Sequence, residues 1–141
     1  MRNPAPKLLE KAITRQVCDF LRARGWRPIR TGVVAGPGYS LGEPGCADYL
    51  FLHYQEAGCA LALWVEMKSP NDKRRCTCAP GKTCKPCRQK LWHQRERARG
   101  GVVWVVADFD AFAAAYDEAY GWLHSGEAAR GQLDLLAGVT G

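Results

Sequence analysis

The chain has 141 residues, of which 47% are hydrophobic and 24% charged, and its formal net charge is +6. This length fits one domain with its own hydrophobic core, and the composition excludes long disordered segments. No apolar run approaches the roughly 20 residues that span a bilayer, which excludes a membrane helix, and the start lacks the apolar stretch of a secretory signal, so we expect a cytoplasmic protein. The basic charge favours a polyanionic partner such as nucleic acid, although a basic protein need not bind one.

The first half of the chain predicts a helix followed by three strands. Residues 7–24 carry apolar side chains at three- and four-residue steps, and Gly25 is typical of a helix end. Glu10 lies on the flank of this apolar stripe. Three strands are expected next, at residues 26–34, 48–54 and 59–68. The glycine- and proline-rich segment 32–45 is expected to be a loop.

The second half predicts a fold in which one insertion interrupts the regular elements. Residues 71–87 show no periodicity and carry four cysteines. A helix, a strand, a further helix and a short terminal helix are expected at residues 88–99, 102–107, 110–123 and 132–137. The apolar run at 102–107 suits a strand that is covered on both faces. The order of elements predicts one α/β domain over residues 1–141, with a mixed central sheet flanked by helices and a cysteine-rich insertion at 71–87.

A carboxylate pair and a lysine gather near the ends of two neighbouring predicted strands. Glu66 and Lys68 are two residues apart on one strand, so their side chains share a face. Asp48 begins the preceding strand, and because adjacent strands lie about 4.8 Å apart, Asp48 and Glu66 could bind one hard cation such as Mg²⁺. Such a site can hydrolyse a phosphodiester, with Lys68 orienting the attacking water or stabilising the transition state. An isolated Glu-x-Lys is also common as a surface salt bridge.

Four short motifs follow one another between about Glu10 and Asp108. They are Glu10 with the helix that ends Phe20-Leu21-Arg22-Ala23-Arg24-Gly25-Trp26, then Gly45-Cys46-Ala47-Asp48, then Trp64-Val65-Glu66-Met67-Lys68-Ser69-Pro70, and finally Gln89 ahead of Gly100-Gly101. In the order and spacing of these motifs the chain resembles the virus-type replication-repair nuclease (VRR-NUC) domain of the PD-(D/E)xK nuclease superfamily.

The resemblance implies a single restriction-endonuclease-like domain and a deoxyribonuclease that depends on Mg²⁺ or Mn²⁺. It makes Asp48, Glu66 and Glu10 metal ligands, Lys68 the catalytic lysine and Gln89 the helix glutamine of the active site. Members of this family and its relatives cut branched or flapped DNA, including Holliday junctions, and are frequent in phages. The resemblance therefore implies a location at the nucleoid of a bacterial or phage-infected cell. Similar stand-alone domains can pair, and a homodimer would place two sites on a four-way junction.

Two features depart from the family pattern. Ala47 stands directly before the aspartate, where the family usually has proline, and this change removes no ligand. The segment between Lys68 and Gln89 is longer than the family norm. Gln94 is a second candidate for the helix glutamine, but the distance from Gln89 to Gly100 matches the family pattern better.

The longer segment holds four closely spaced cysteines, namely Cys76, Cys78, Cys84 and Cys87. Two close pairs of thiolates can form a tetrahedral Zn²⁺ site, and a polar loop with few apolar residues needs such a metal to become ordered. The total of seven cysteines is odd, which argues against a disulfide framework. Structural zinc is therefore expected, and free thiols or an adventitious disulfide are the alternatives.

Basic residues surround the cysteines, and those expected to bind DNA beside the active site are Arg74, Arg75, Lys82, Lys85, Arg88 and Lys90.

His53 and His93 are interpreted as structural or solvated, as lone histidines usually are. The favoured interpretation is a nuclease that acts on branched or flapped DNA. The alternatives are a catalytically inactive, zinc-stabilised DNA-binding module and an interaction subunit whose cysteines fix a docking loop.

Overall fold

The computed structural model describes residues 6–32, 43–72, 76, 78 and 84–140, and of residues 6–8 and 126–140 it describes the helical backbone alone. The predicted loop at 32–45 and the predicted insertion at 71–87 fall largely outside the described residues. The chain divides into two compact units, Met1–Ala107 and Asp108–Gly141, which are described separately.

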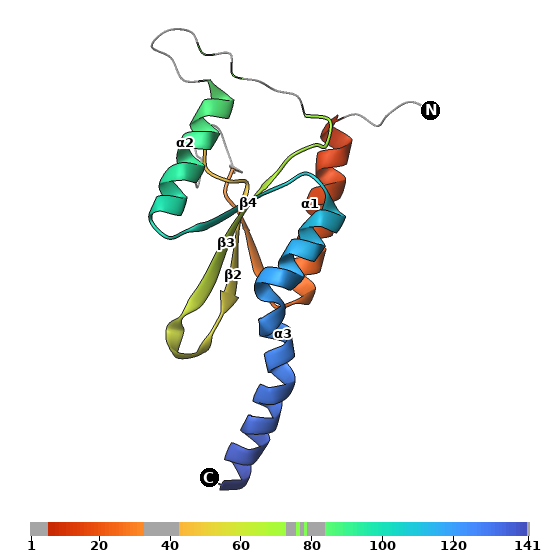
Figure 1. Cartoon of the computed structure of the whole chain (residues 1–141), viewed down its shortest axis with the longest axis vertical. Coiled ribbons are helices and arrows are strands. Elements are labelled where there is room, and N and C mark those ends of the chain that lie inside the picture. The colour runs from red at the N-terminus through yellow and green to blue at the C-terminus, as the bar shows by residue number, and fades with distance from the viewer. Residues whose placement is uncertain (1–5, 33–42, 73–75, 77, 79–83, 141) are drawn as a thin grey trace, which may run out of the picture. The chain divides into compact units, whose positions relative to one another are not determined.

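The first unit is built on a four-stranded mixed sheet (Figure 1). Its elements are α1 (Pro6–Ala23), β1 (Arg27–Arg30), β2 (Tyr49–Tyr54), the short 3₁₀ helix η1 (Glu56–Gly58), β3 (Ala60–Met67), α2 (Lys85–Ala98) and β4 (Val102–Val106). The strand order is β1-β2-β3-β4, with β1, β2 and β3 antiparallel and β4 parallel to β3. The predicted α/β class with a mixed sheet is confirmed.

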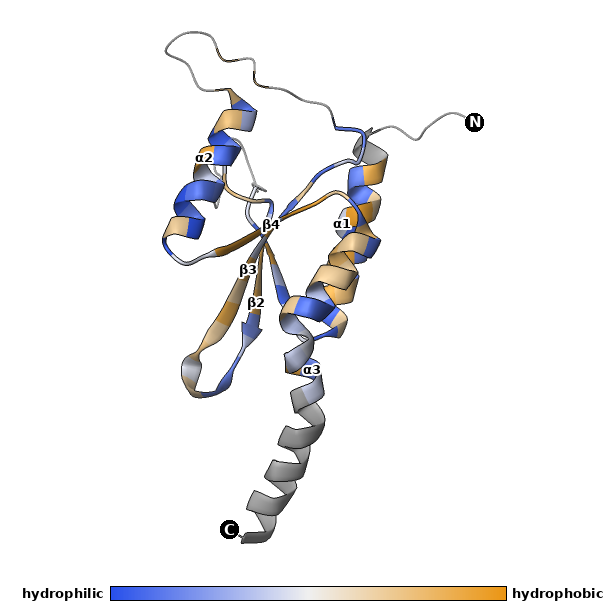
Figure 2. Ribbon diagram, viewed as in Figure 1, coloured by the Kyte–Doolittle hydropathy of each residue, from blue (hydrophilic) through white to orange (hydrophobic). Residues whose placement is uncertain are grey.

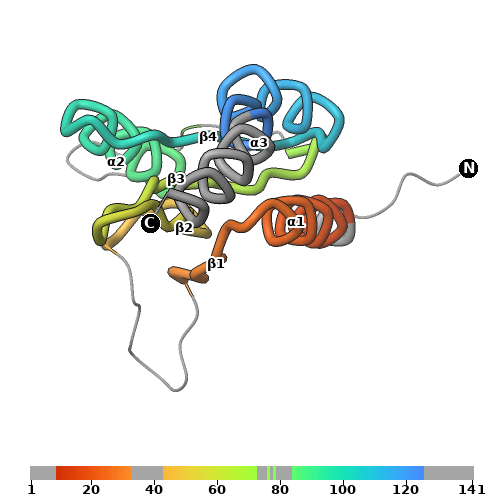
Figure 3. The backbone as a smooth tube through the Cα atoms, turned by 90° about the horizontal axis from the view of Figure 1, so that it is seen from below, coloured from red at the N-terminus to blue at the C-terminus, as the bar shows by residue number. Residues whose placement is uncertain are grey.

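The two helices of this unit lie on opposite sides of the sheet, with α1 against β1 and β3 and α2 against β4 (Figure 3). The main core is formed by side chains whose exposed fraction is 0%, namely Val17, Leu21, Phe51, Leu63 and Val65. Phe51 and Leu63 are partners across β2 and β3, so their side chains share one face of the sheet. The opposite face of the sheet, toward α2, carries the side chains that alternate along β3 with Leu63 and Val65, among them Trp64 and Glu66.

Helix α2 is mostly hydrophilic, in contrast to β3 and β4 (Figure 2). It is anchored by Trp92, which is buried with Ala47 and Val103 and packs edge-to-face on Trp64 with ring centroids 4.9 Å apart. The loop before β2 also approaches the helix closely. Gly45 has a φ of +83°, and a Cβ added there would lie 2.6 Å from the carbonyl oxygen of Arg88, so only glycine permits this approach.

Strand β4 differs from its prediction as a strand covered on both faces. That prediction is wrong for Val105, whose exposed fraction is 50%. Val105 pairs with Glu66 in the parallel register and lines an open cavity beside that carboxylate. The continuous apolar run therefore includes one side chain that faces the candidate site rather than the core.

The second unit is the single helix α3 (Phe109–Thr140). Asp108 caps its start, since Oδ1 accepts a hydrogen bond of 3.0 Å from the backbone N–H of Asp110. The predicted interruption between residues 123 and 132 is wrong, because residues 127–130 are mostly strong helix formers and no proline accompanies Gly126 or Gly131. Among the described residues, no helix combines the length and apolar character needed to cross a membrane.

Candidate active site and cysteine cluster

Glu66 is the central residue of the candidate site. It lies near the end of β3, on the face that α2 covers, and its exposed fraction is only 1%. Neither of its carboxylate oxygens has a hydrogen bond of normal geometry among the described residues. Burying a carboxylate without such partners costs several kcal/mol. An exposed salt bridge between Glu66 and Lys68, the simplest alternative for this sequence pattern, therefore does not describe this glutamate.

The electrostatic environment of Glu66 favours its protonated form. Burial raises the pKa of Glu66 to about 7, with a further rise from the nearby Asp48 carboxylate and partial opposition from the Lys68 ammonium. Without a cation, this carboxyl group is therefore protonated in a large fraction of molecules near neutral pH. A bound cation would favour the ionised form instead.

Lys68 is held between Glu66 and helix α2. Its Nζ donates a hydrogen bond of 2.9 Å to Oε1 of Gln89 and lies 3.6 Å from Oε1 of Glu66. The exposed fraction of the lysine side chain is 23%, so the ammonium group is accessible to a ligand from solvent. Of the two glutamines considered on α2, the structure brings Gln89 to the lysine, whereas Gln94 is exposed.

Asp48 is fixed by backbone groups of two neighbouring strands. Its Oδ2 accepts a hydrogen bond of 2.9 Å from the backbone N–H of Met67. Its carbonyl oxygen accepts hydrogen bonds of 3.0 Å from both the backbone N–H and the hydroxyl of Thr31, and the same hydroxyl donates to the carbonyl oxygen of Ala47. Thr31 therefore braces the turn that holds Ala47 and Asp48. No sequence motif pointed to this threonine.

The three carboxylates expected to share one cation line two different cavities. Asp48 and Glu10 line a cavity of about 750 Å³, whereas Glu66 lines a second cavity of about 530 Å³ with Lys68 and Gln89. Glu10 lies on α1, and α1 and α2 lie on opposite sides of the sheet (Figure 3). Among the described residues, the cysteine cluster is the sole group of three or more potential ligands whose donor atoms all lie within 4.8 Å.

The cavity that contains Asp48 is lined by five basic residues and by three acidic ones, Glu10, Asp19 and Asp48 itself. The basic residues that line it are Lys11, Arg15, Arg22, Arg30 and Lys85. Three of them recur on α1 at four- and seven-residue steps, which places them along one face of the helix. No carboxylate of the described residues forms an ion pair with any of the five. These cations are therefore available to an anionic ligand.

The basic residues predicted to bind DNA are only partly described. Lys85 lines the cavity beside Asp48, and Arg88 and Lys90 are exposed on α2. The remaining three, Arg74, Arg75 and Lys82, lie outside the described residues.

His93 is a site residue that the sequence interpretation passed over. Its Nε2 lies 2.6 Å from Oε2 of Glu66, yet neither atom has a hydrogen bond of normal geometry within the part of the chain that the structure describes. Burial lowers the pKa of His93, and the positive charges of Arg97 and Lys68 lower it further. The sequence could have indicated this role, because His93 follows Gln89 by one helical turn. The two side chains therefore lie on the same face of α2.

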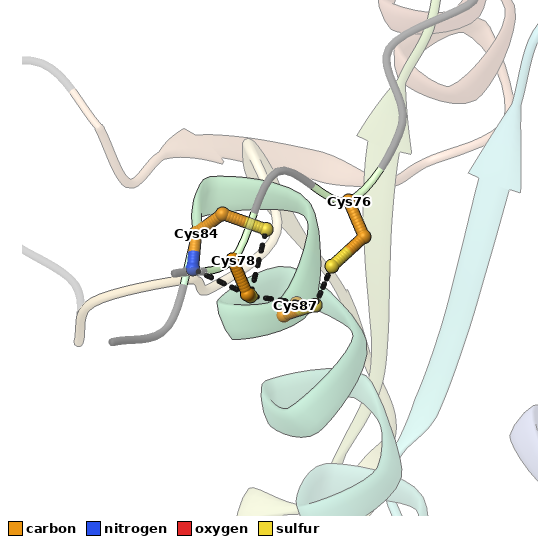
Figure 4. Close-up of side chains that lie close together, drawn as sticks. All are labelled: Cys76, Cys78, Cys84 and Cys87. Atoms are coloured by element: carbon orange, nitrogen blue, oxygen red, sulfur yellow. Dashed lines mark hydrogen bonds between the residues drawn. The ribbon is translucent and has the colours of Figure 1, made fainter. Parts of the chain in front are cut away.

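The four cysteines of the predicted metal site converge (Figure 4). The sulfur–sulfur distances are 3.2 Å for Cys78–Cys84, 3.5 Å for Cys78–Cys87 and 3.3 Å for Cys76–Cys87, and no disulfide joins these four described residues. Tetrahedral zinc with bonds of about 2.3 Å would hold sulfurs about 3.8 Å apart, so a small outward shift accommodates the ion. The cluster could therefore hold a metal ion.

The cysteine cluster is joined directly to helix α2. Cys84 is the residue before the helix, and its carbonyl oxygen accepts a hydrogen bond of 3.0 Å from the backbone N–H of Arg88. Hydrogen bonds with the neighbouring sulfurs, foremost the one that the Cys87 thiol donates to Cys76, raise the pKa of Cys87 to about 12. A metal ion would have to displace these protons in order to bind.

No family model, no curated protein and no solved structure matches this chain. The assignment of a function therefore depends on the residues of the chain itself and on the geometry that joins Glu66, Lys68, Asp48 and the cysteine cluster.

Proposed function

We propose that this protein is a metal-dependent deoxyribonuclease of the PD-(D/E)xK type, built on a restriction-endonuclease-like core. The observation that carries the proposal is the Glu66 carboxylate, which is 1% exposed and whose two oxygens have no hydrogen bond of normal geometry among the described residues. It lies beside Lys68 and close enough to Asp48 for their charges to interact. Such a carboxylate lowers the stability of the fold, whereas a divalent cation would supply the missing partner.

The residues present suit Mg²⁺ or Mn²⁺ at the Asp48 and Glu66 end of the sheet. A bound cation of this kind lowers the pKa of a water molecule and neutralises charge on a phosphodiester. Lys68, oriented by Gln89, keeps an ammonium group available to donate to the attacking water or to a phosphate oxygen. Glu10 would act from the neighbouring cavity rather than as a partner of Glu66 on one ion.

The test of this proposal is cleavage of labelled linear, flapped and four-way-junction DNA with Mg²⁺, with Mn²⁺ and with EDTA. We expect cleavage that requires the metal, prefers branched or flapped DNA, and is lost in Asp48→Asn. Asp117→Asn, an equivalent change at an exposed position of α3, is the matched control and should cleave like the wild type. Binding without cleavage on every substrate would overturn the nuclease and favour the zinc-stabilised DNA-binding module.

The basic cavity beside Asp48 supports DNA as the substrate, because unpaired arginines release counterions when they neutralise phosphates. The double variant Arg15→Ala/Arg22→Ala should bind DNA about tenfold more weakly or worse. The slope of log affinity against log salt concentration should fall by about 0.9 for each phosphate that the variant no longer neutralises. Fluorescence anisotropy at several salt concentrations measures both quantities.

The matched control for this double variant removes the same charge elsewhere. Arg95 and Arg99 are exposed near the end of α2 and do not line the cavity that contains Asp48. If Arg95→Ala/Arg99→Ala changed the salt slope as much as the cavity variant, the basic cavity would not be the DNA-binding surface.

We assign the four-cysteine cluster to structural Zn²⁺. Four thiolate ligands close the coordination sphere of zinc and leave no position for a substrate, which suits a structural rather than a catalytic ion. The described part of this segment is exposed or half-exposed, so burial cannot supply the energy that holds the sulfurs together.

A further inference from the structure

We propose that His93 is a nitrogen ligand of the divalent cation held by Glu66, and that it makes this site selective for Mn²⁺ over Mg²⁺. The inference rests on the proposed metal site and names a further ligand of it. The resemblance to the VRR-NUC domain assigned no role to the residue at this position.

The arrangement of the two side chains fits two ligands of one ion better than a hydrogen bond. Nε2 of His93 and Oε2 of Glu66 lie 2.6 Å apart, but no aligned N–H···O bond joins them. Two neighbouring ligands with bonds of about 2.1 Å at right angles are about 3.0 Å apart. The nitrogen lone pair then points at the ion and not at the neighbouring oxygen. A movement of a few tenths of an ångström would therefore open the position for a cation.

Both ligands belong to packed elements, so their meeting is a property of the fold and not of a loop. Glu66 belongs to β3, and His93 follows the buried anchor Trp92 on α2, with the two rings 5.9 Å apart. The exposed fraction of His93 is 8%. Rigid placement of this kind is what a metal site requires.

The chemistry of the ligand determines which cation it favours. Mg²⁺ binds oxygen ligands and keeps much of its water, so an imidazole adds little to its affinity. Transition metals accept imidazole readily, and Mn²⁺ also accepts the carboxylate oxygens of Asp48 and Glu66. A site with one nitrogen ligand should therefore bind Mn²⁺ more tightly than Mg²⁺.

The experiment is pulsed EPR of Mn²⁺ added to the full chain after its cysteine cluster has been loaded with zinc. Electron spin echo modulation should show a ¹⁴N nucleus bonded to Mn²⁺, and labelling the histidines with ¹⁵N should change that signal. The signal should vanish in His93→Leu and persist in the control His53→Leu. His93→Gln, which keeps a polar side chain, provides a second variant if leucine disturbs folding.

Calorimetry should show Mn²⁺ affinity falling about tenfold or more in the His93 variants, with a smaller change for Mg²⁺. An absent ¹⁴N signal, or one that survives in His93→Leu, would overturn the inference even if the protein cleaves DNA. A histidine signal in a protein that cleaves no DNA would support the ligand while the proposed nuclease fails. The two proposals are therefore tested separately.

Discussion

Replacing Glu66 with glutamine is expected to lower metal-dependent DNA cleavage about a thousandfold, which corresponds to about 4 kcal/mol of transition-state stabilisation. Glutamine has nearly the same shape, so it can occupy the buried position, but its neutral amide holds a divalent cation poorly. Single-turnover cleavage with saturating Mn²⁺ or Mg²⁺ measures the effect on the chemical step. Wild-type rates in Glu66→Gln would exclude the metal site as described.

The matched control is Glu56→Gln on the exposed η1 turn, which removes the same charge far from the proposed chemistry along the β2–β3 hairpin. It should leave the cleavage rate unchanged. A similar loss in both variants would mean that overall charge, and not the buried carboxylate, controls activity.

The same Glu66→Gln variant should be more stable than the metal-free wild type at neutral and alkaline pH. Glu66 titrates near 4.5 when unfolded and near 7 when folded, mainly because of burial. The folded state therefore binds the extra proton, and the wild type should lose up to about 3 kcal/mol of stability as pH rises from about 4.5 to 7. Denaturant unfolding in EDTA at several pH values should show this loss in the wild type and a flatter profile in Glu66→Gln.

Removing the metal from the cysteine cluster should lower the melting temperature by roughly 10 °C. Structural zinc contributes about 10 kcal/mol or more in isolated peptides, but only part of this affects global unfolding when the cluster lies in an exposed segment. A loss of about 3 kcal/mol in the free energy of unfolding gives the expected shift, because each kcal/mol lowers the melting temperature of a domain of this size by about 3–4 °C. The variant is Cys84→Ser/Cys87→Ser, measured by zinc analysis and by thermal unfolding.

The matched control is Cys59→Ser, because Cys59 is an exposed free cysteine outside the cluster. The wild type and this control should carry about one zinc ion per chain, and the double variant almost none. Equal zinc content in all three proteins, or an unchanged melting temperature in the double variant, would refute a structural zinc site.

The sequence predicted the sheet well, because β2, β3 and β4 are short runs of mostly apolar residues bounded by turn residues. Glu66 and Lys68 share one face, as their spacing of two residues required, with Nζ of Lys68 3.6 Å from Oε1 of Glu66. The start of α2 was predicted three residues late. Residues 85–87 show no helical periodicity of their own, but proline is common in the first turn of a helix, and Pro86 takes that place in α2.

Burial and the pairing of distant side chains could not be predicted from local patterns. The depth of Glu66 depends on α2, which is separated from it in the chain by the cysteine segment. The support of Asp48 by Thr31 depends on the position of a residue that precedes a long glycine-rich segment. Glu10 was expected at the same ion from the family resemblance alone, because helix spacing gives only its neighbours on α1 and not the side of the sheet that the helix covers.

Helix α2 carries Cys87 of the cysteine cluster in its first turn, the glutamine that bonds to Lys68 two residues later, and the histidine that faces Glu66 after one more turn. Each residue added to a helix turns all that follows by about 100°. Inserting or deleting one residue between Cys87 and Gln89 would thus leave the cysteines in place while rotating the glutamine and the histidine away from the lysine and the carboxylate. In related chains, substitutions on the outer face of this helix should be tolerated, whereas changes of its length before His93 should not.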